Sequence, residues 1–133
     1  MSCSSAIHTV NSTETSLSSG STVPFGATIR RFGRHIEHAP DGIILSERGY
    51  YNIECSVTIR ASEPGTIEVA LCVDGDPLPG RSAKASVHEA GDYVTLPLCS
   101  LVRICEKDLK QTLSVRILCP GTVTSMSTVV MKV

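Results

Sequence analysis

The chain has 133 residues and a formal net charge of -1, so its length fits one domain and its charge gives no reason to expect nucleic acid or an anionic membrane as a partner. Hydrophobic residues make up 41% of the chain and charged residues 19%, whereas aromatic residues make up only 4%. We therefore expect a core of Val, Ile, Leu and Cys, and no stretch is apolar for long enough to predict membrane insertion.

The N-terminal region, residues 1–22, is rich in Ser and Thr, and we assign it as an arm of the same domain as residues 23–133. Within this arm, residues 6–10 are compatible with a first strand, and the remainder is expected to be loop. Residues 1–5 carry no basic side chain and no apolar stretch follows them, so a classical secretory signal is not expected.

Two short apolar segments follow the arm. Val23-Pro24-Phe25-Gly26 is typical of an edge strand, because proline cannot donate a hydrogen bond to a neighbouring strand. An Asp41-Gly42 turn then precedes a short strand that is predicted over residues 43–45.

The segment between them, residues 27–38, is the most basic part of the chain. Its basic or titratable side chains are Arg30, Arg31, Arg34, His35 and His38. Because acidic residues lie close by, we interpret it as solvated surface first and as a site for an anionic glycan or polymer second. His35, His38 and Asp41 could ligate a metal, but paired histidines in a polar loop more often have no ligand, and no metal site is predicted.

The clearest pattern lies between Gly49 and Gly75. Apolar residues occupy every second position at Tyr51, Ile53, Cys55, Val57 and Ile59. The alternation resumes over residues 67–73 after a Glu63-Pro64-Gly65 turn, and Asp74-Gly75 is a strong hairpin signal. This pattern predicts antiparallel strands that place one face on a core.

The remaining elements are also expected to be strands and turns. A loop is predicted at Pro77, Pro79 and Gly80, and a weak strand over residues 82–87. Residues 93–104 form a long strand with a bulge or bend near Pro97, and further strands cover residues 112–118 and 122–133. No segment has helical periodicity, so the pattern indicates an all-β sandwich or barrel.

The last strand is apolar on both of its faces. Met126, Thr128 and Val130 lie on one face, and Val129, Met131 and Val133 lie on the other. A strand of this kind is usually covered on both sides. The domain core can cover one side, and either a loop or another subunit is needed for the second.

Catalytic chemistry is not supported by the remaining motifs. There is no G-x-S-x-G sequence, and the histidines His8, His35, His38 and His88 lie in predicted loops, turns or strand starts. Asp74-Gly75-Asp76 resembles a fragment of a calcium loop, but turn geometry explains it fully. We therefore predict a protein that is not an enzyme and has no cofactor.

The six cysteines are Cys3, Cys55, Cys72, Cys99, Cys105 and Cys119. Several occupy regular strand positions among aliphatic residues, where a free thiol packs as a small apolar group. There is no CxxC motif, so mostly free thiols are expected, with one disulfide among Cys99, Cys105 and Cys119 as the alternative.

A family resemblance rests on the order and spacing of several segments. These are Val23-Pro24-Phe25, Ile43-Ile44-Leu45, Gly49-Tyr50-Tyr51, residues 69–75, Pro79-Gly80, residues 101–105 and residues 126–133. Together they resemble the jelly-roll domains related to tumour necrosis factor and to the globular head of the first complement component. Within that superfamily the chain looks closest to the C-terminal domains of bacterial spore-surface collagen-like glycoproteins and to phage head-fibre proteins. It lacks a collagen-like tract, and the positions where that family often has interface aromatics are mostly aliphatic or polar.

The resemblance implies a ten-stranded antiparallel jelly roll that forms a threefold homotrimer. Tyr51 would then point into the core, Asn52 and Glu54 would face neighbouring subunits, and Val129, Met131 and Val133 would lie near the axis. Arg103 or Arg116 could pair with Glu54, or Glu54 could lie on a solvated sheet face.

The functional expectation is a non-catalytic trimeric module for display or adhesion on a virion, spore or cell surface. It would be cytoplasmic before assembly and bind a glycan or another cell-surface ligand through loops, with Asp76, Arg81, Lys107 and Lys110 as candidate residues in residues 76–81 and 106–111. A purely structural trimerisation or decoration protein is the alternative, and a small carbohydrate-active β-sandwich enzyme is the third.

Overall fold

The computed structural model describes residues 5–40, 42–105 and 110–133, and these residues form eleven strands and no helix. The strands are β1 (Ser5–Asn11), β2 (Thr15–Leu17), β3 (Ala27–Phe32), β4 (Ile36–Ala39), β5 (Gly42–Leu45), β6 (Gly49–Ala61), β7 (Gly65–Val73), β8 (Asp76–Val87), β9 (Tyr93–Ile104), β10 (Gln111–Ile117) and β11 (Gly121–Lys132). None of the described residues belongs to a helix with the length and apolarity that crossing a membrane would need.

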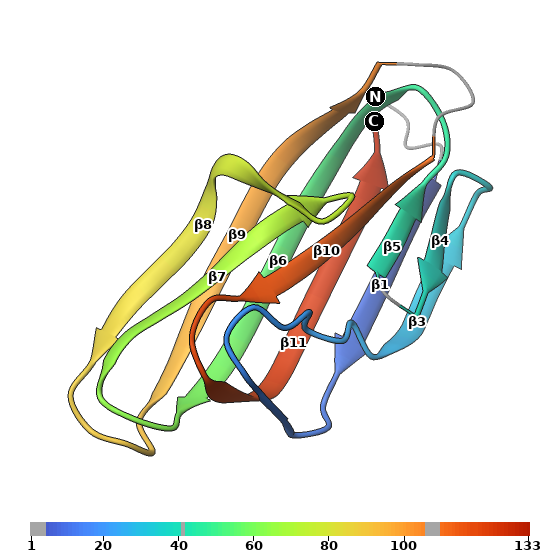
Figure 1. Ribbon diagram of the computed structural model, residues 1–133. Helices are drawn as coiled ribbons and strands as arrows, with labels where there is room; N and C mark the ends of the chain where they lie inside the picture. Colours follow the sequence, from blue (N-terminus) through green and yellow to red (C-terminus); the bar gives the residue numbers. More distant parts are fainter. Residues whose placement is uncertain (1–4, 41, 106–109) are drawn as a thin grey trace.

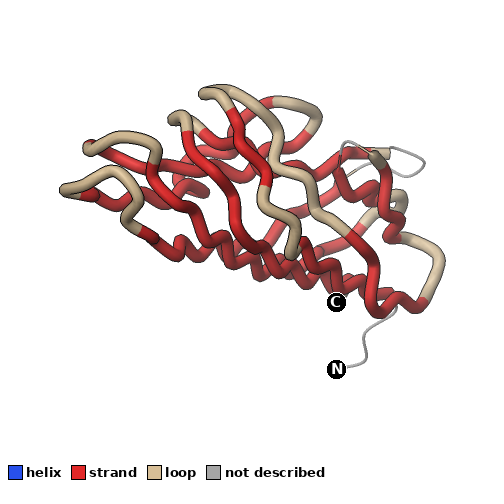
Figure 2. The backbone as a smooth tube through the Cα atoms, turned by 90° about the horizontal axis from the view of Figure 1, so that it is seen from below, coloured by secondary structure: helices blue, strands red, loops and turns tan. Residues whose placement is uncertain are grey.

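The strands form two antiparallel sheets that pack face to face (Figure 1). Sheet A has the order β3-β1-β11-β6-β9, with the short β2 paired to the beginning of β11, and sheet B has the order β4-β5-β10-β7-β8. The expected ten strands are therefore present, and β2 is an addition. Seen along the layers, the molecule is strand almost throughout, and loops connect the strands at the ends (Figure 2).

The core lies between the inward faces of the two sheets. On β6 the alternation predicted from the sequence is confirmed, because Tyr51, Ile53, Val57 and Ile59 are completely buried. Sheet B contributes, among others, Ile43, Leu45, Val69, Leu71, Leu113, Val115 and Ile117. Aliphatic residues dominate this list, as expected for a chain with few aromatic residues.

The first and last strands lie side by side in the middle of sheet A. The predicted strand over residues 6–10 is confirmed as β1, and its register with β11 runs from Ser5 opposite Lys132 to Asn11 opposite Met126. The beginning of β1 and the end of β11 therefore lie at the same end of the sandwich.

The Asp74-Gly75 hairpin is confirmed, with both residues at positive φ, 52° for Asp74 and 84° for Gly75. This pair of angles matches the twist of the flanking strands β7 and β8. The side chain of Asp74 also accepts a hydrogen bond from the backbone N–H of Thr112 at 2.8 Å. The turn is therefore held against β10. This agrees with the interpretation of Asp74-Gly75 as a hairpin turn.

The segments around β3 and β4 were predicted incorrectly. Residues 23–26 are not a strand; this stretch runs alongside β10, where the backbone N–H of Val23 donates to the carbonyl of Val115 at 2.7 Å. The basic segment is not a loop, because it forms β3 in sheet A and β4 in sheet B. Every residue of β3 is exposed, so the strand has no alternation of buried side chains from which it could be recognised.

Two further predictions on β8 and β9 were wrong. The pairing of β9 with β6 is regular over its whole length, so the bulge, one of the two irregularities predicted near Pro97, is absent; proline is tolerated because β9 is the edge strand of sheet A. Residues 76–81 are the first part of β8 and not a free loop, and the irregularity in that region lies opposite Ala70 to Cys72 of β7.

The phenolic hydroxyl of Tyr51 supports the turn before β6. It donates a hydrogen bond to the carbonyl of Glu47 at 2.7 Å and accepts one from the N–H of Glu47 at 3.2 Å. We expect Tyr51→Phe to lower the free energy of unfolding by about 1 to 2 kcal/mol, because both backbone groups lose this partner. Tyr50→Phe is the control, because Tyr50 is 44% exposed. This substitution should change the free energy of unfolding by less than about 0.5 kcal/mol. Equal urea-unfolding midpoints for the two variants would contradict this role.

The five described cysteines are free thiols, and the titration of the buried Cys55 should affect stability. Burial raises its pKa from an ordinary 9.0 to about 11, and a hydrogen bond from Thr128 opposes the shift in part. Because the folded pKa is raised, this contribution is fully present below pH 9 and is lost as the pH rises towards 11. Between pH 9 and pH 11, urea unfolding should show that the free energy of unfolding of the native protein falls by roughly 2 to 3 kcal/mol more than that of Cys55→Ala. Parallel pH profiles would contradict the assignment.

Candidate functional site

The strongest candidate site is the outer face of sheet A, the side turned away from the core. Register places its residues in rows across five strands. One row consists of Phe32, Ala6, Met131, Asn52 and Leu101, and the next consists of Arg30, His8, Val129, Glu54 and Cys99. The sequence-predicted residues Asn52, Glu54, Val129 and Met131 therefore lie together on this face.

The outer face carries exposed apolar side chains, next to polar ones, in the single chain. Phe32 is 54% exposed, Leu101 53% and Val133 43%, and Val129 and Met131 are only partly buried. On the opposite side of β11, Met126, Thr128 and Val130 are buried in the core, as the alternation predicted. The exposed fractions of Phe32, Leu101 and Val133 show that no described loop shields these three side chains.

A hollow of about 260 Å³ interrupts the outer face between β6, β9 and β11. Its lining residues are Glu54, Cys55, Ser56, Cys99, Ser127 and Val129. The hollow lies towards the β9 edge of the sheet, whereas the aromatic ring of Phe32 lies on β3 at the other edge. A projecting side chain and a recess thus occupy opposite sides of one surface.

The charges on the outer face are also separated. Glu54 lies on β6 and makes no ion pair among the described residues, and His8 and Arg30 lie towards the β3 edge. Nε2 of His8 is 3.0 Å from the hydroxyl of Ser127. Neither expected partner reaches Glu54 within the described chain: the guanidinium of Arg103 lies 5.8 Å from the ring centre of Tyr50, and Arg116 donates to the carbonyl of Gly75 from sheet B.

The four candidate recognition residues do not form one cluster. Asp76 is exposed at the start of β8, and Lys110 is exposed just before β10. Arg81 donates from Nε to the hydroxyl of Ser100 at 3.2 Å, which ties β8 of one sheet to β9 of the other. Lys107 lies outside the described residues.

The histidine pair proposed as a metal candidate is separated by its partners. His35 forms an ion pair with Glu47, and Nδ1 of His38 is 3.0 Å from the hydroxyl of Thr28. Asp41 lies outside the described residues. Among the residues that the structure describes, no group of three or more His, Cys, Asp and Glu side chains could hold a metal ion.

Several residues of the outer face were missed at the sequence level, namely Ala6, His8, Phe32, Cys99 and Leu101. The alternation of β1 contained a usable signal, because Ala6, His8 and Val10 occupy every second position. Placing them on this face requires the pairing of β1 with β11, which joins residues more than one hundred positions apart and leaves no local trace in the sequence.

No protein-family model matches the chain, and no curated protein matches its sequence. Solved structures do match. Murine APRIL at pH 5.0 has a TM-score of 0.74 at 15% identity, covering 97% of this chain and 98% of that chain. The globular domain of zebrafish complement 1qA protein has a TM-score of 0.69 at 8% identity, covering 93% and 94%. PRD1 vertex protein P5 has a TM-score of 0.58 at 13% identity, covering 100% and 99%.

The fold is the tumour necrosis factor-like jelly roll. The predicted resemblance to the tumour necrosis factor and complement-head superfamily is thereby confirmed at the level of fold. In this jelly roll the first and last strands pair at the centre of one sheet, and that sheet carries the uncovered apolar face.

Proposed function

We propose that the protein is a non-catalytic homotrimeric module that serves surface display or adhesion on the outside of a virion. The observation that carries this proposal is the uncovered apolar outer face of sheet A, which contains Phe32, Leu101, Val129, Met131 and Val133. Contiguous exposed apolar surface of this kind marks an interaction site, and a second copy of the chain would remove it from water.

The arrangement of the face favours a cyclic assembly. In a head-to-tail contact, the outer side of β3 in one copy meets the outer side of β9 in the next, and a closed ring results when the rotation fits. Such a contact brings Phe32 of one copy towards the hollow beside Cys99 of its neighbour, and Arg30 towards Glu54. The same contact supplies the partner that Glu54 lacks in the single chain.

The placement on a virion draws support from the structural likeness to a vertex protein. A purely structural trimerisation or decoration role is the second candidate, since the same apolar face would serve it equally. Binding of whole cells or of a glycan array by the intact protein would support adhesion, and trimers that bind neither would support decoration.

Sedimentation at micromolar concentration tests the assembly directly. We expect a species of three times the 14.2 kDa chain mass, because the family resemblance implies three copies in the closed ring. A species of 14.2 kDa that persists at the highest soluble concentration would overturn the proposal. A dimer would be compatible with contact through the outer face but would reject the head-to-tail ring of three copies.

Two exposed thiols provide an independent prediction. Cys99 lies on the outer face, and Cys105 lies beyond the end of β9, outside the sheet. Native alkylation with iodoacetamide, followed by peptide mass spectrometry, should modify Cys105 about tenfold faster than Cys99, because assembly covers the latter. In a variant that cannot assemble, the two rates should become similar. Equal rates in the assembled protein would place Cys99 outside the contact.

A further inference from the structure

A second site lies at the sandwich edge where β3 of sheet A and β4 of sheet B run close together. Two adjoining hollows of about 330 and 360 Å³ share His38 as a lining residue. We call them together the edge notch. Its lining residues are Pro24, Phe25, Gly26, Thr28, Arg31, Glu37, His38, Ala39 and Pro40. Each hollow is within the size range of small-ligand sites.

One half of the edge notch is polar and its groups are held in place. Nε of Arg31 donates to the carbonyl of Ile36 at 2.9 Å, which fixes the side chain. Arg31 forms no ion pair with any described residue, so its terminal nitrogens can bind an anion. The hydroxyl of Thr28 engages Nδ1 of His38, which leaves Nε2 of that ring for a ligand. A positioned guanidinium without a carboxylate partner favours an anionic oxygen pair.

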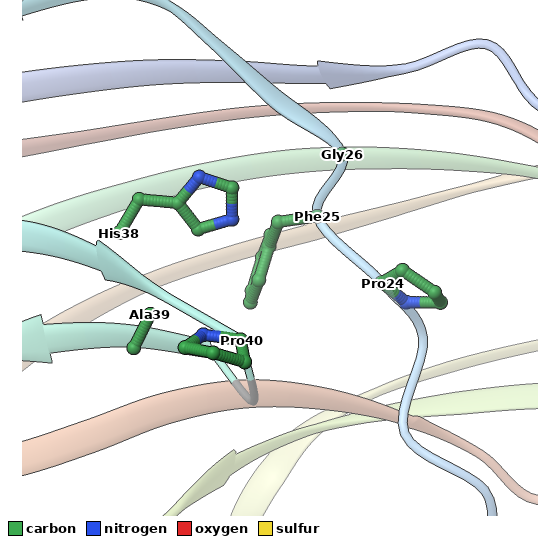
Figure 3. A pocket seen from close by; sticks show the side chains of 6 residues that line it. All are labelled: Pro24, Phe25, Gly26, His38, Ala39 and Pro40. Carbon is green, nitrogen blue, oxygen red and sulfur yellow. The ribbon is translucent and has the colours of Figure 1, made fainter.

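The other half is lined by two proline rings and Phe25. Pro24 and Pro40 flank the ring of Phe25, and the imidazole of His38 lies on the side where the polar half begins (Figure 3). Phe25 is only 3% exposed and is anchored in the core. Proline rings have little freedom to lose, so they offer a fixed surface for an apolar ring face at small entropic cost.

The edge notch is separate from the outer face of sheet A. Arg31 is paired with the buried Ile7, and Thr28 with the buried Thr9, so both side chains lie on the inner side of β3. Arg30 pairs with His8 and lies on the outer side. The contact proposed above uses the outer side of β3, through Arg30 and Phe32, so Arg31 and Thr28 are not among the residues that it involves.

We infer that the edge notch binds a carboxylated sugar, such as a terminal uronic or sialic acid. Arg31 and Nε2 of His38 would hold the carboxylate, and the prolines would contact the apolar face of the sugar ring. Glu37 also lines the polar half; its carboxylate accepts hydrogen bonds from sugar hydroxyls and disfavours densely sulfated or phosphorylated polymers. The biological role of this site rests on the proposed adhesive function. Its binding chemistry needs only the single chain and does not depend on the trimer.

Saturation-transfer difference NMR on the intact protein tests this assignment. The probes are glucuronate and N-acetylneuraminate, with glucose as the neutral match for glucuronate and acetyl-dialanine as a carboxylate without a sugar. We expect ring-proton signals from at least one acidic sugar, with a millimolar dissociation constant, and none from glucose or the peptide. Arg31→Gln should weaken binding about tenfold, and His38→Gln should weaken it by a smaller factor.

Arg34→Gln is the matched control, because it removes the same charge from the bend between β3 and β4, and Arg34 lines neither hollow. Equal losses of sugar binding in Arg34→Gln and Arg31→Gln would show that only general charge matters and would overturn the site. Binding of the peptide but not of the sugars would overturn the sugar assignment, and absence of all binding would overturn both. Sedimentation of the same samples separates the proposals, since a trimer that binds no sugar rejects only the edge notch, and a monomer that binds sugar rejects only the assembly.

Discussion

Val129→Asp is expected to convert the assembled protein into a 14.2 kDa monomer at micromolar concentration. Val129 lies on the outer face between His8 of β1 and Glu54 of β6, at the border of the hollow beside Cys99. A carboxylate there would be buried in the contact without an adequate partner and next to another acid. An unpaired buried charge costs several kcal/mol in each copy, which exceeds the surplus by which typical subunits associate.

The fold of this variant should remain intact, because Val129 is only partly buried in the single chain. Ser86→Asp is the matched control: Ser86 is exposed on β8 of sheet B, where the same charge should leave the mass unchanged. Circular dichroism with a strand spectrum like that of the native protein would show that Val129→Asp is folded. A folded Val129→Asp variant that still sediments as the trimer would remove the outer face from the interface.

Gly26→Ala is expected to cause a large loss of stability. Gly26 has a φ of 86°, and a Cβ added there would lie 2.3 Å from the backbone oxygen of Val10 and 2.6 Å from Cα of Asn11. Backbone atoms of β1 cannot move aside without breaking its pairing with β11. Left-handed strain of about 1 to 2 kcal/mol and a clash of about 1 to 3 kcal/mol should together lower the free energy of unfolding by roughly 2 to 5 kcal/mol.

The control for this substitution is Gly20→Ala. Gly20 has nearly the same φ, 90°, but an added Cβ would meet nothing within 4 Å. It should therefore suffer the conformational strain alone, about 1 to 2 kcal/mol. Thermal unfolding measures the difference, at about 4 °C per kcal/mol for a domain of this size. If both variants melt at the same temperature, the contact with β1 is not a constraint on the fold.

The parts of the fold that were predictable from sequence are those where burial alternates along one strand. The alternation of β6, the Asp74-Gly75 turn and the two-sided apolar character of β11 each depend on neighbouring residues, and each was identified correctly. By contrast, β3 was missed because all six of its side chains are exposed, which removes the only pattern that distinguishes a strand from a polar loop.

The candidate site was only partly predictable for a related reason. Residues on β6 and β11 could be assigned to the outer face from their alternation, whereas Phe32, His8 and Leu101 belong to it only through pairings between distant strands. The edge notch was out of reach, because the inward turn of Arg31 and the outward turn of Arg30 depend on the register of β3 with β1. The basic character of the segment was visible, but the side of the strand that each guanidinium occupies was not.

The pairing of Ser5 with Lys132 gives the module a direction in an assembly. A carrier protein joined to either terminus would be attached at that one end of the sandwich. Gly26 packs against Val10 and Asn11 at the other end of β1, so the proline-lined part of the edge notch lies further from the carrier than the start of β1 does. Tethering at the termini would thus keep the attachment point and the sugar site apart without any change in the domain itself.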